Sequence, residues 1–419
     1  MPEASPPAGS AVRAALGKTF QSLAARNFRL FFIGQLISNT GNQLTNVALI
    51  LFVLKLGHSG LAVGALAACQ FGPLIALSAW AGAVADRTDK RRALLLTQSL
   101  EMAQSVGLAA LAFMPAPPLV LLYAISLAGG VLLAFDNPLR RSFVPEMVSQ
   151  EQLPNAVVLY GTIVALSQVA GPALAGALVS TVGFGWCFVL DAVTYLAVLG
   201  CLVAMRPGEL FRQAPKPRTG REVREGLRYV ASVPRLWISF AMFALVGIFS
   251  FNLRVALPLF VTRSLRSSDV AFAALYAVLS GGAVVGTLVV AHRRLVELRH
   301  AVVSALTLGL ALLVLAVMPS VPVAVPAAFV VGAASLVYFT ASTSIAQVGT
   351  RRDMHGRVLA LQTALIGGAA LVGGPIVGQL ADVAGGRAPI AIGGLVCVAA
   401  AGLGEIARRR FAQSDAPAG

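Results

Sequence analysis

Twelve apolar segments, each long enough to cross a lipid bilayer, run along this chain of 419 residues. A helix rises 1.5 Å per residue, so about 20 apolar residues cross a hydrocarbon core about 30 Å thick. The segments cover 28–56, 60–85, 93–114, 118–137, 156–181, 184–205, 236–261, 270–291, 301–318, 322–347, 358–383 and 388–407. Because lipid offers no hydrogen bonds to an irregular backbone, we expect an all-α membrane protein with twelve transmembrane helices.

The basic residues indicate which gaps between the segments face the same side of the membrane. Of the 32 Lys and Arg residues, 27 lie in or beside every second gap. The opposite gaps hold only Lys55, Arg263, Arg266 and Arg387, and Arg254 lies inside a segment. This alternation follows the positive-inside rule and predicts a multi-pass protein of the cell (inner) membrane with both termini cytoplasmic. The net charge of +15 then reflects topology and contact with membrane lipids, and no nucleic acid partner is expected.

One long polar stretch inside the chain divides the segments six and six. We expect a cytoplasmic tail at 1–27, helical bundles at 28–205 and 235–407, a cytoplasmic linker at 206–234 and a second cytoplasmic tail at 408–419. Within the linker, Val223, Leu227 and Val230 share the spacing of one helix face. This pattern predicts a short amphipathic helix on the cytoplasmic surface.

The two halves of the chain repeat weakly. Gly171 and Pro172 in the fifth segment correspond to Gly374 and Pro375 in the eleventh, 203 residues later. Proline bends a helix and glycine permits close approach of a neighbour, so these pairs predict bent, closely packed helices. Gly and Pro are also common in ordinary membrane helices, and the pair alone does not decide between the two readings.

The loop after the second segment carries a motif of charged residues and glycine. It contains Gly82, Asp86, Arg87, Lys90 and Arg91 in an arrangement that resembles the major facilitator superfamily signature G-x-x-x-D-R-x-G-R-R. Asp89 stands where the family has its second glycine. The resemblance implies that this loop is a conformational latch between the two halves. The alternative is a basic cluster that serves topology alone.

Further stretches resemble the branch of that superfamily that contains the bacterial enterobactin exporter and macrolide-efflux proteins. They are residues 27–35, the loop 137–156, residues 225–229 and residues 356–358. The resemblance implies two pseudo-symmetric six-helix bundles and export of a small amphipathic organic molecule (siderophore, drug or secondary metabolite). It also implies alternating access with proton antiport. Uptake or lipid translocation by the same fold is the alternative, and we expect a monomer.

A stripe of amide side chains follows the first segment at helical spacing. Amides are costly in lipid, so this face is expected to point into the protein, either lining a cavity or bonding other helices. The resemblance implies a central cavity lined by the first, fourth, seventh and tenth segments. The candidate cavity residues are Gln35, Asn39, Asn42, Asn46, Arg254, Tyr338 and Ser342.

Few acids lie inside the segments, and any of them could carry a proton if it alternates between wet and dry surroundings. Glu101 and Asp191 are the candidates for proton coupling, although a structural hydrogen-bonding role for Glu101 is equally compatible with its polar neighbours. Asp136 and Asp382 lie near segment ends and are expected to be caps or loop partners. Arg254 could bind an anionic group of the substrate or serve the scaffold in an ion pair, for instance with Asp191.

The alternatives from another class are a multispan membrane enzyme, which would need clustered His and Asp or a nucleophile facing one side, and a sensor, which would more often carry a soluble domain. The sequence offers no sign of an enzyme or of a cofactor. Gly17-Lys18-Thr19 lacks the upstream glycine of a phosphate-binding loop, since Val12 is there. The four His are dispersed without metal-ligand spacing, and the four Cys lie singly in apolar segments as packing residues. Without a nucleotide site, transport would be driven by a proton or other ion gradient, or by the gradient of the substrate.

Overall fold

The computed structural model of the protein describes residues 20–211, 222–291, 297–351 and 354–414, which are helical and contain no strand. The first half consists of α2 (Arg26–Gly57), α3 (Gly60–Arg87), α4 (Lys90–Ala112), α5 (Leu119–Phe143), α6 (Leu153–Thr181) and α7 (Phe184–Ala204). The second half consists of α9 (Pro234–Ser250), α10 (Leu253–Leu259), α11 (Asp269–Ala291), α12 (Leu298–Val317), α13 (Val321–Val348), α14 (His355–Ala384) and α15 (Ala388–Ser414). Short helical turns lie at Gln21–Ala24, Val144–Glu146, Pro207–Glu209 and, as the π-helix η4, Phe260–Ser264.

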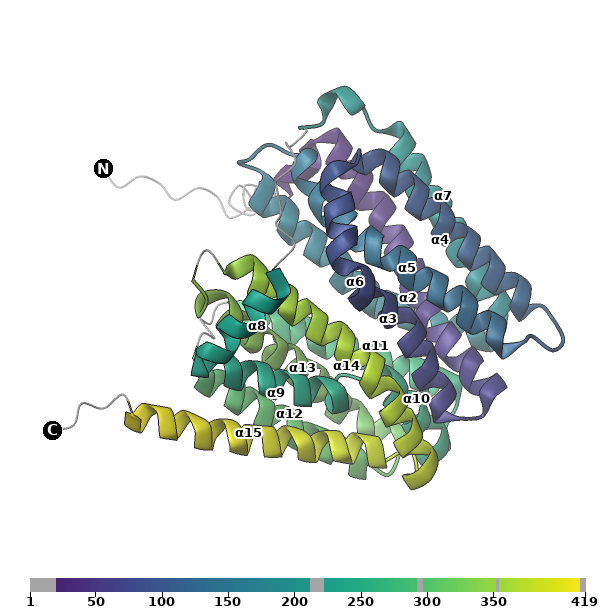
Figure 1. The fold of residues 1–419 in the computed structure, drawn as a ribbon. Coiled ribbons are helices and arrows are strands. Elements are labelled where there is room, and N and C mark those ends of the chain that lie inside the picture. Colours follow the sequence, from purple (N-terminus) through teal and green to yellow (C-terminus); the bar gives the residue numbers. More distant parts are fainter. Residues whose placement is uncertain (1–19, 212–221, 292–296, 352–353, 415–419) are drawn as a thin grey trace, which may run out of the picture.

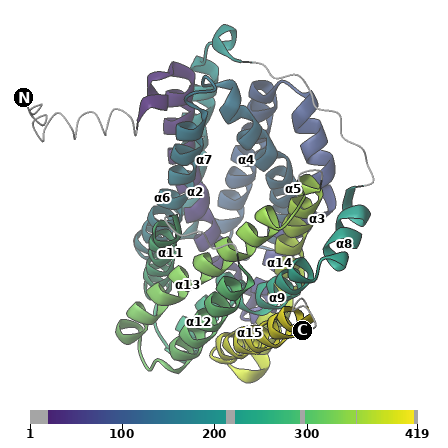
Figure 2. The same ribbon diagram turned by 90° about the vertical axis from the view of Figure 1, so that its left-hand side faces the viewer.

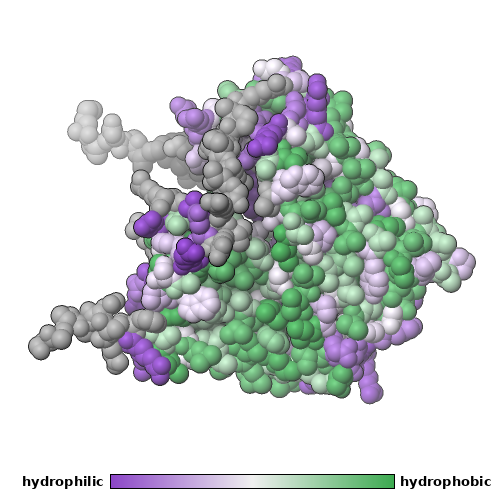
Figure 3. Space-filling view, viewed as in Figure 1, coloured by the Kyte–Doolittle hydropathy of each residue, from purple (hydrophilic) through white to green (hydrophobic). Residues whose placement is uncertain are grey.

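Ten helical segments of the described chain are long and apolar enough to cross a membrane. The helices α2 and α4 are also long, at 32 and 23 residues, but they carry most of the polar side chains considered below. Large apolar side chains such as Val120, Leu288 and Leu403 are more than 60% exposed. Figure 3 shows hydrophobic residues over most of the visible flank and hydrophilic ones mainly toward its ends. This surface fits lipid rather than water.

The seventh segment differs from the continuous helix that was expected. Its helix stops at Ser250, restarts as α10 at Leu253 and ends in the π-helix η4. At the break, the side-chain amide of Asn252 donates to the carbonyls of Ile248 at 2.8 Å and Ala369 at 3.1 Å. A short side-chain amide that bonds backbone carbonyls competes with helix continuation, and this explains the interruption.

Most basic residues of the described chain lie at one end of the molecule. One end, which we call the basic end, holds the start of α2, the α3–α4 loop, α8 (Glu222–Ser232) and the end of α15 (Figures 1 and 2). The other end, which we call the far end, holds the α2–α3 and α14–α15 connections.

The helix α8 lies where the sequence predicts a short amphipathic helix in the linker. In α8, Val230 is buried and Leu227 is half exposed, while the side chain of Val223 lies outside the described residues.

Equivalent turns of the two halves have the same backbone conformation. Gly183, between α6 and α7, has φ of 84°, and Gly385, between α14 and α15, has φ of 85°. Only glycine adopts this left-handed region at low cost. The repeat seen in the sequence therefore continues through the turns that follow the fifth and eleventh membrane segments.

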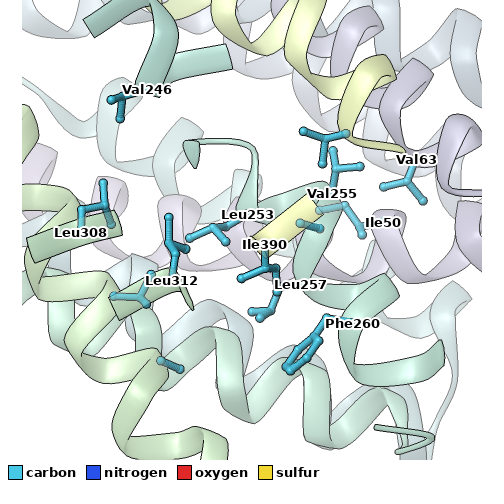
Figure 4. Packing of buried hydrophobic residues seen from close by; sticks show 14 of the residues in the cluster. Ile50, Val63, Val246, Leu253, Val255, Leu257, Phe260, Leu308, Leu312 and Ile390 are labelled. Atoms are coloured by element: carbon cyan, nitrogen blue, oxygen red, sulfur yellow. The ribbon is translucent and has the colours of Figure 1, made fainter. Parts of the chain in front are cut away.

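Among the described residues, the hydrophobic cluster that joins the two halves lies toward the far end of the first half. One large cluster runs through the second half and includes Ile50 and Val63 of the first half, beside Val255 of α10 (Figure 4). A separate cluster around Phe31 and Phe143 fills the basic end of the first half and contains no described residue of the second half. In Figure 1 the two groups of helices accordingly diverge toward the basic end.

Candidate functional site

A buried ionic cluster lies within the first half, near the basic end. Arg140, in the last turn of α5, forms an ion pair with Asp136 one turn earlier and a second one with Glu101 of α4, at 3.4 Å. The three side chains are between 2% and 9% exposed. The expectation that Asp136 is a cap or loop partner is therefore wrong. It failed because α5 continues to Phe143, beyond the expected end of the fourth segment, and carries the acid and the arginine into the bundle.

Amide side chains complete the shell around the guanidinium. Gln35 and Asn39 of α2 accept hydrogen bonds from Nη1 of Arg140 at 2.6 and 3.3 Å. Gln98 of α4 donates to both carboxylates of the cluster, at 2.8 and 2.9 Å. A buried charge must be paired or hydrogen-bonded. The two amides nearest the start of the predicted α2 stripe therefore bind a buried arginine, and Gln35 is fully buried.

Asp191 of α7 extends this polar interior toward the far end. Its carboxylate accepts hydrogen bonds from Ser105 at 2.7 Å and from Thr194 at 3.4 Å. Ser105 lies one turn after Glu101 on α4, so both predicted proton-coupling residues face the interior of the first half. Asp191 is 1% exposed and has no ion pair with a described residue.

The charges of this interior do not balance. Asp136, Glu101 and Asp191 are three acids, and Arg140 is the one basic residue among them. With all four ionised the group carries two net negative charges, and it becomes neutral when two protons bind. A group of buried carboxylates with surplus negative charge is suited to taking up and releasing protons.

The remaining amides of α2 lie between the buried cluster and the far end. Asn46 donates to Asn42 at 3.0 Å and accepts from Gln70 of α3 at 3.4 Å, and Asn42 donates to Tyr195 of α7 at 3.3 Å. Asn39, Asn42 and Asn46 are each partly exposed. These residues can both bond other helices and present polar groups to the space between the halves.

The two candidates on α13 are buried in this conformation. Tyr338 and Ser342 are 0% and 1% exposed. The ring of Tyr338 packs against Phe243 of α9 and Phe251, with centroid separations of 6.3 and 6.1 Å. Neither residue lines an open space here, so a role in binding would require a conformation in which α9 and α13 separate.

Arg254, the candidate in the seventh segment, lies over a ring of the first half. Its guanidinium carbon is 5.4 Å from the ring centroid of Phe71 in α3. The residue follows directly after the break between α9 and α10 and is partly exposed. It forms no ion pair with Asp191, which is held by Ser105.

The halves are tied together at the far end by Asp382, near the end of α14. Its carboxylate accepts hydrogen bonds from the backbone N–H groups of Gly60 and Leu61 at 2.6 and 2.9 Å, and from the Ser59 hydroxyl at 2.7 Å. It also pairs at 2.7 Å with Arg263 of its own half. A carboxylate at a helix N-terminus satisfies free N–H groups and opposes the helix dipole. We call these five residues the far-end lock.

Glycines let the helices α3 and α14 touch beside this lock. A methyl group on Gly60 or Gly64 would collide with the backbone of Gly378 or Gly374. A methyl group on Gly378 would collide with Gly60, and one on Gly374 would lie in tight contact with Gly64, at 3.0 Å. On the second interface between the halves, a methyl group on Gly176 of α6 would lie 2.7 Å from Ala273 of α11. We call Gly60 and Gly64 of α3, together with Gly374 and Gly378 of α14, the glycine seam.

The glycines predicted as bends act mainly through such close approach. Gly374 belongs to the seam, with Pro375 beside Gly64. Gly171 lies against Gln43 and Leu44 of α2, within the first half. The helices α6 and α14 run without interruption through Pro172 and Pro375.

The latch motif contacts its own half in this conformation. Lys90 pairs with Glu146 at 2.6 Å, and Arg91 donates to the carbonyls of Leu202 and Val203 at 2.8 and 3.1 Å. Asp86 has no hydrogen bond or ion pair with a residue that the structure describes. Gly82 is partly exposed and Arg87 exposed at the basic end, where the halves diverge.

Sequence reasoning missed Arg140 and the far-end lock. The sequence predicts a topological role for Arg140, as for the other basic residues beside every second gap, although its spacing of four residues from Asp136 is the spacing of neighbours on one helix face. No local sequence pattern predicts the far-end lock, because Asp382 and Gly60 are 322 residues apart.

A family model described as "Transmembrane secretion effector" matches residues 17–417. The Staphyloferrin A transporter of Staphylococcus aureus is 30% identical over 176 residues, which are 42% of this chain and 44% of that protein, so the match spans less than half of that relative. The Enterobactin exporter EntS of Salmonella typhimurium is 27% identical over 361 residues, 83% of this chain and 85% of that protein.

Solved structures share the fold at low sequence identity. A bacterial homolog to the human lysosomal transporter Spinster, in an inward-facing and unoccupied conformation, aligns with a TM-score of 0.71 at 16% identity and covers 92% of this chain and 97% of that chain. A peptide transporter POT in complex with sulfate aligns with a TM-score of 0.74 at 15% identity, covering 92% and 95%. The twelve-helix fold is thereby confirmed, and the chain belongs to the transmembrane secretion effector family of major facilitator superfamily transporters.

Proposed function

We propose that this transporter exports a small amphipathic organic molecule of the siderophore class in exchange for protons. The named relatives are a siderophore transporter and a siderophore exporter, and both share sequence with this chain. The observation that carries proton exchange is the unbalanced group of Asp136, Glu101, Asp191 and Arg140, buried within the half that also holds the latch motif. Membrane-embedded acids in a transporter typically relay protons.

The proposed cycle begins in the conformation described here. The substrate enters from the basic end, where the halves diverge, while the far-end lock and the glycine seam keep the other end closed. Opening the far end requires Asp382 to leave the N-terminus of α3 and the helices α3 and α14 to part. Protonation of Glu101 or Asp191 from the outside would then accompany release, and proton loss at the basic end would reset the cycle.

The proposed orientation places the basic end in the cytoplasm. It supports the division into two cytoplasmic tails, two bundles and a cytoplasmic linker. Reporter fusions at Gly220 and after Arg410 should be active only as cytoplasmic reporters, and a fusion at Ser267 only as an external one. An inverted result at any of the three positions would contradict this topology.

Transport is tested in proteoliposomes with a pH gradient imposed across the membrane. We expect uphill movement of an iron-free siderophore only when protons flow in the opposite direction, and no uphill movement after a protonophore collapses the gradient. Citrate-based and catecholate siderophores are the substrates to compare, with a neutral sugar as the negative control. Equal transport with and without the proton gradient would overturn proton exchange.

A further inference from the structure

Arg254 differs from the other charged residues described in the spanning helices of the second half. The others lie within five residues of an end of their membrane segment or form an ion pair, as Arg357 does with Glu225 and Glu405 does with Arg408. Arg254 is the second residue of α10 but lies inside the segment Pro234–Ser264 that α9, α10 and η4 form together. Arg254 lies ten residues before the end of η4, about 15 Å along a helix, and has no hydrogen bond or ion pair with any residue the structure describes. A guanidinium this deep without an anion is costly.

Its surroundings show that the exposed part of this side chain faces protein rather than lipid. The helix α10 packs against α2 and α3 of the first half and against α11, α14 and α15 of the second half. The guanidinium lies over Phe71, which belongs to the opposite half. Since helices of both halves surround α10, the partly exposed guanidinium faces the space between them.

The chemistry around Arg254 suits an anion. The face of Phe71 stabilises the cation without neutralising its charge. Gln70, the neighbour of Phe71, and Asn46, to which it is hydrogen-bonded at 3.4 Å, are partly exposed and bring further amide groups to this side of α3. A guanidinium with free donors binds carboxylates through paired hydrogen bonds.

Charges are also divided between the halves. The buried acids lie in the first half, and the deep unpaired cation lies in the second. An anionic substrate would be repelled by the first group and attracted by the second. Protons and substrate would then bind to different halves.

We propose that Arg254 is the anion-recognition residue of the transport site, where it binds a carboxylate or similar oxyanion of the transported molecule. This inference rests on the proposed function only for the identity of the anion as cargo. An anionic lipid headgroup carries the same chemistry, so the test separates the two sources.

The first measurement is binding by titration calorimetry, with citrate and its neutral trimethyl ester as probes, in neutral phosphatidylcholine nanodiscs. We expect the wild type to bind citrate in preference to the ester, and Arg254→Leu to lose about tenfold or more of the citrate affinity. Arg254→Lys should retain part of it, and Arg410→Leu, which removes an exposed arginine, should match the wild type. No preference for citrate, or an equal preference in Arg254→Leu, would overturn the proposal.

The second measurement is transport of a citrate-based siderophore and of its esterified, uncharged form. Arg254→Leu should lose transport of the charged form selectively. Equal loss of transport of both forms would show that Arg254 has a structural role only. The same citrate titration in phosphatidylglycerol vesicles tests the lipid as ligand. If this anionic lipid abolishes citrate binding to the wild type but leaves the residual citrate binding of Arg254→Leu unchanged, a lipid headgroup is the ligand and the cargo assignment is wrong. Failure of proton-driven transport in the wild type would remove the proposed function, while the binding result would still decide the role of Arg254.

Discussion

The carboxylate of Asp382 accepts a hydrogen bond of 2.6 Å from the backbone N–H of Gly60, and so joins the end of α14 to the first turn of α3. The two helices run antiparallel and belong to different halves. Asp86 occupies the matching position near the end of α3, at the basic end, where the halves diverge. The pair α3 and α14 therefore carries an acid at each end, and only the far-end acid is engaged here.

Asp382→Asn should shift the protein toward the conformation open at the far end. The substitution removes the negative charge that binds Arg263 and the N-terminus of α3, and such charge-assisted bonds contribute about 1.5–3 kcal/mol each. Labelling of a cysteine at Ala65 by a membrane-impermeant maleimide should speed up severalfold. Ser180→Ala, at the same end but bonded only within α6, is the control and should leave the labelling rate unchanged. Unaltered labelling in Asp382→Asn would show that the lock does not limit opening.

Gly64→Ala should weaken closure of the far end. The added methyl group meets the backbone of Gly374, which cannot move aside as a side chain can, and overpacking of this kind costs about 1–3 kcal/mol. Transport should fall, and distances measured between spin labels on α3 and α14 should lengthen. Gly161→Ala is the matched control, because nothing lies within 4 Å of the added methyl group there. Loss of transport in both variants would indicate a general effect of alanine and not the seam.

Glu101→Gln and Asp191→Asn test proton exchange separately. For whichever residue carries the proton, the neutral amide should abolish uphill transport while downhill exchange continues, because a group that cannot ionise cannot couple. The dependence of transport on pH should flatten in that variant. Glu151→Gln, an exposed residue in a loop, should behave like the wild type. If pH dependence persists unchanged in both buried variants, coupling uses another group or another ion.

Arg140→Met should be strongly destabilising, since it leaves two buried carboxylates without their counterion. Breaking a buried ion pair on one side costs about 3–5 kcal/mol. The thermal unfolding midpoint should drop, and Asp136→Asn combined with Arg140→Met should restore part of the loss. A double variant no more stable than Arg140→Met would show that Asp136 is not the main partner.

Asp86→Asn isolates the latch. In the present conformation Asp86 bonds no described residue, so the change should leave unfolding and monodispersity near those of the wild type while lowering transport. The expected reason is that closing the basic end brings Asp86 to the N-terminus of α14, as Asp382 already lies at the N-terminus of α3. Arg91→Ala is less informative, because Arg91 also holds the end of α7. Normal transport in Asp86→Asn would show that the motif only sets the membrane topology and does not act as a latch.

The sequence predicts the helices better than their contacts. Apolar length and the alternation of charge are local properties, so the membrane segments agree with the structure to within a few residues at most ends. The role of Arg140 cannot be read from the sequence, because a basic residue near the end of an apolar run resembles a topological charge. Whether it instead reaches into the bundle depends on Glu101 and Gln35, which come from other helices. The break before Arg254 depends on Asn252 reaching Ala369, a carbonyl more than a hundred residues away.

The glycine seam also indicates how the transporter could be inhibited. Its two helices meet backbone to backbone at these four glycines. A compound shaped to the closed seam and the Asp382 carboxylate would bind one conformation and not the other. Such a ligand shifts the equilibrium by its difference in affinity alone, so it could arrest the cycle without competing with the cargo.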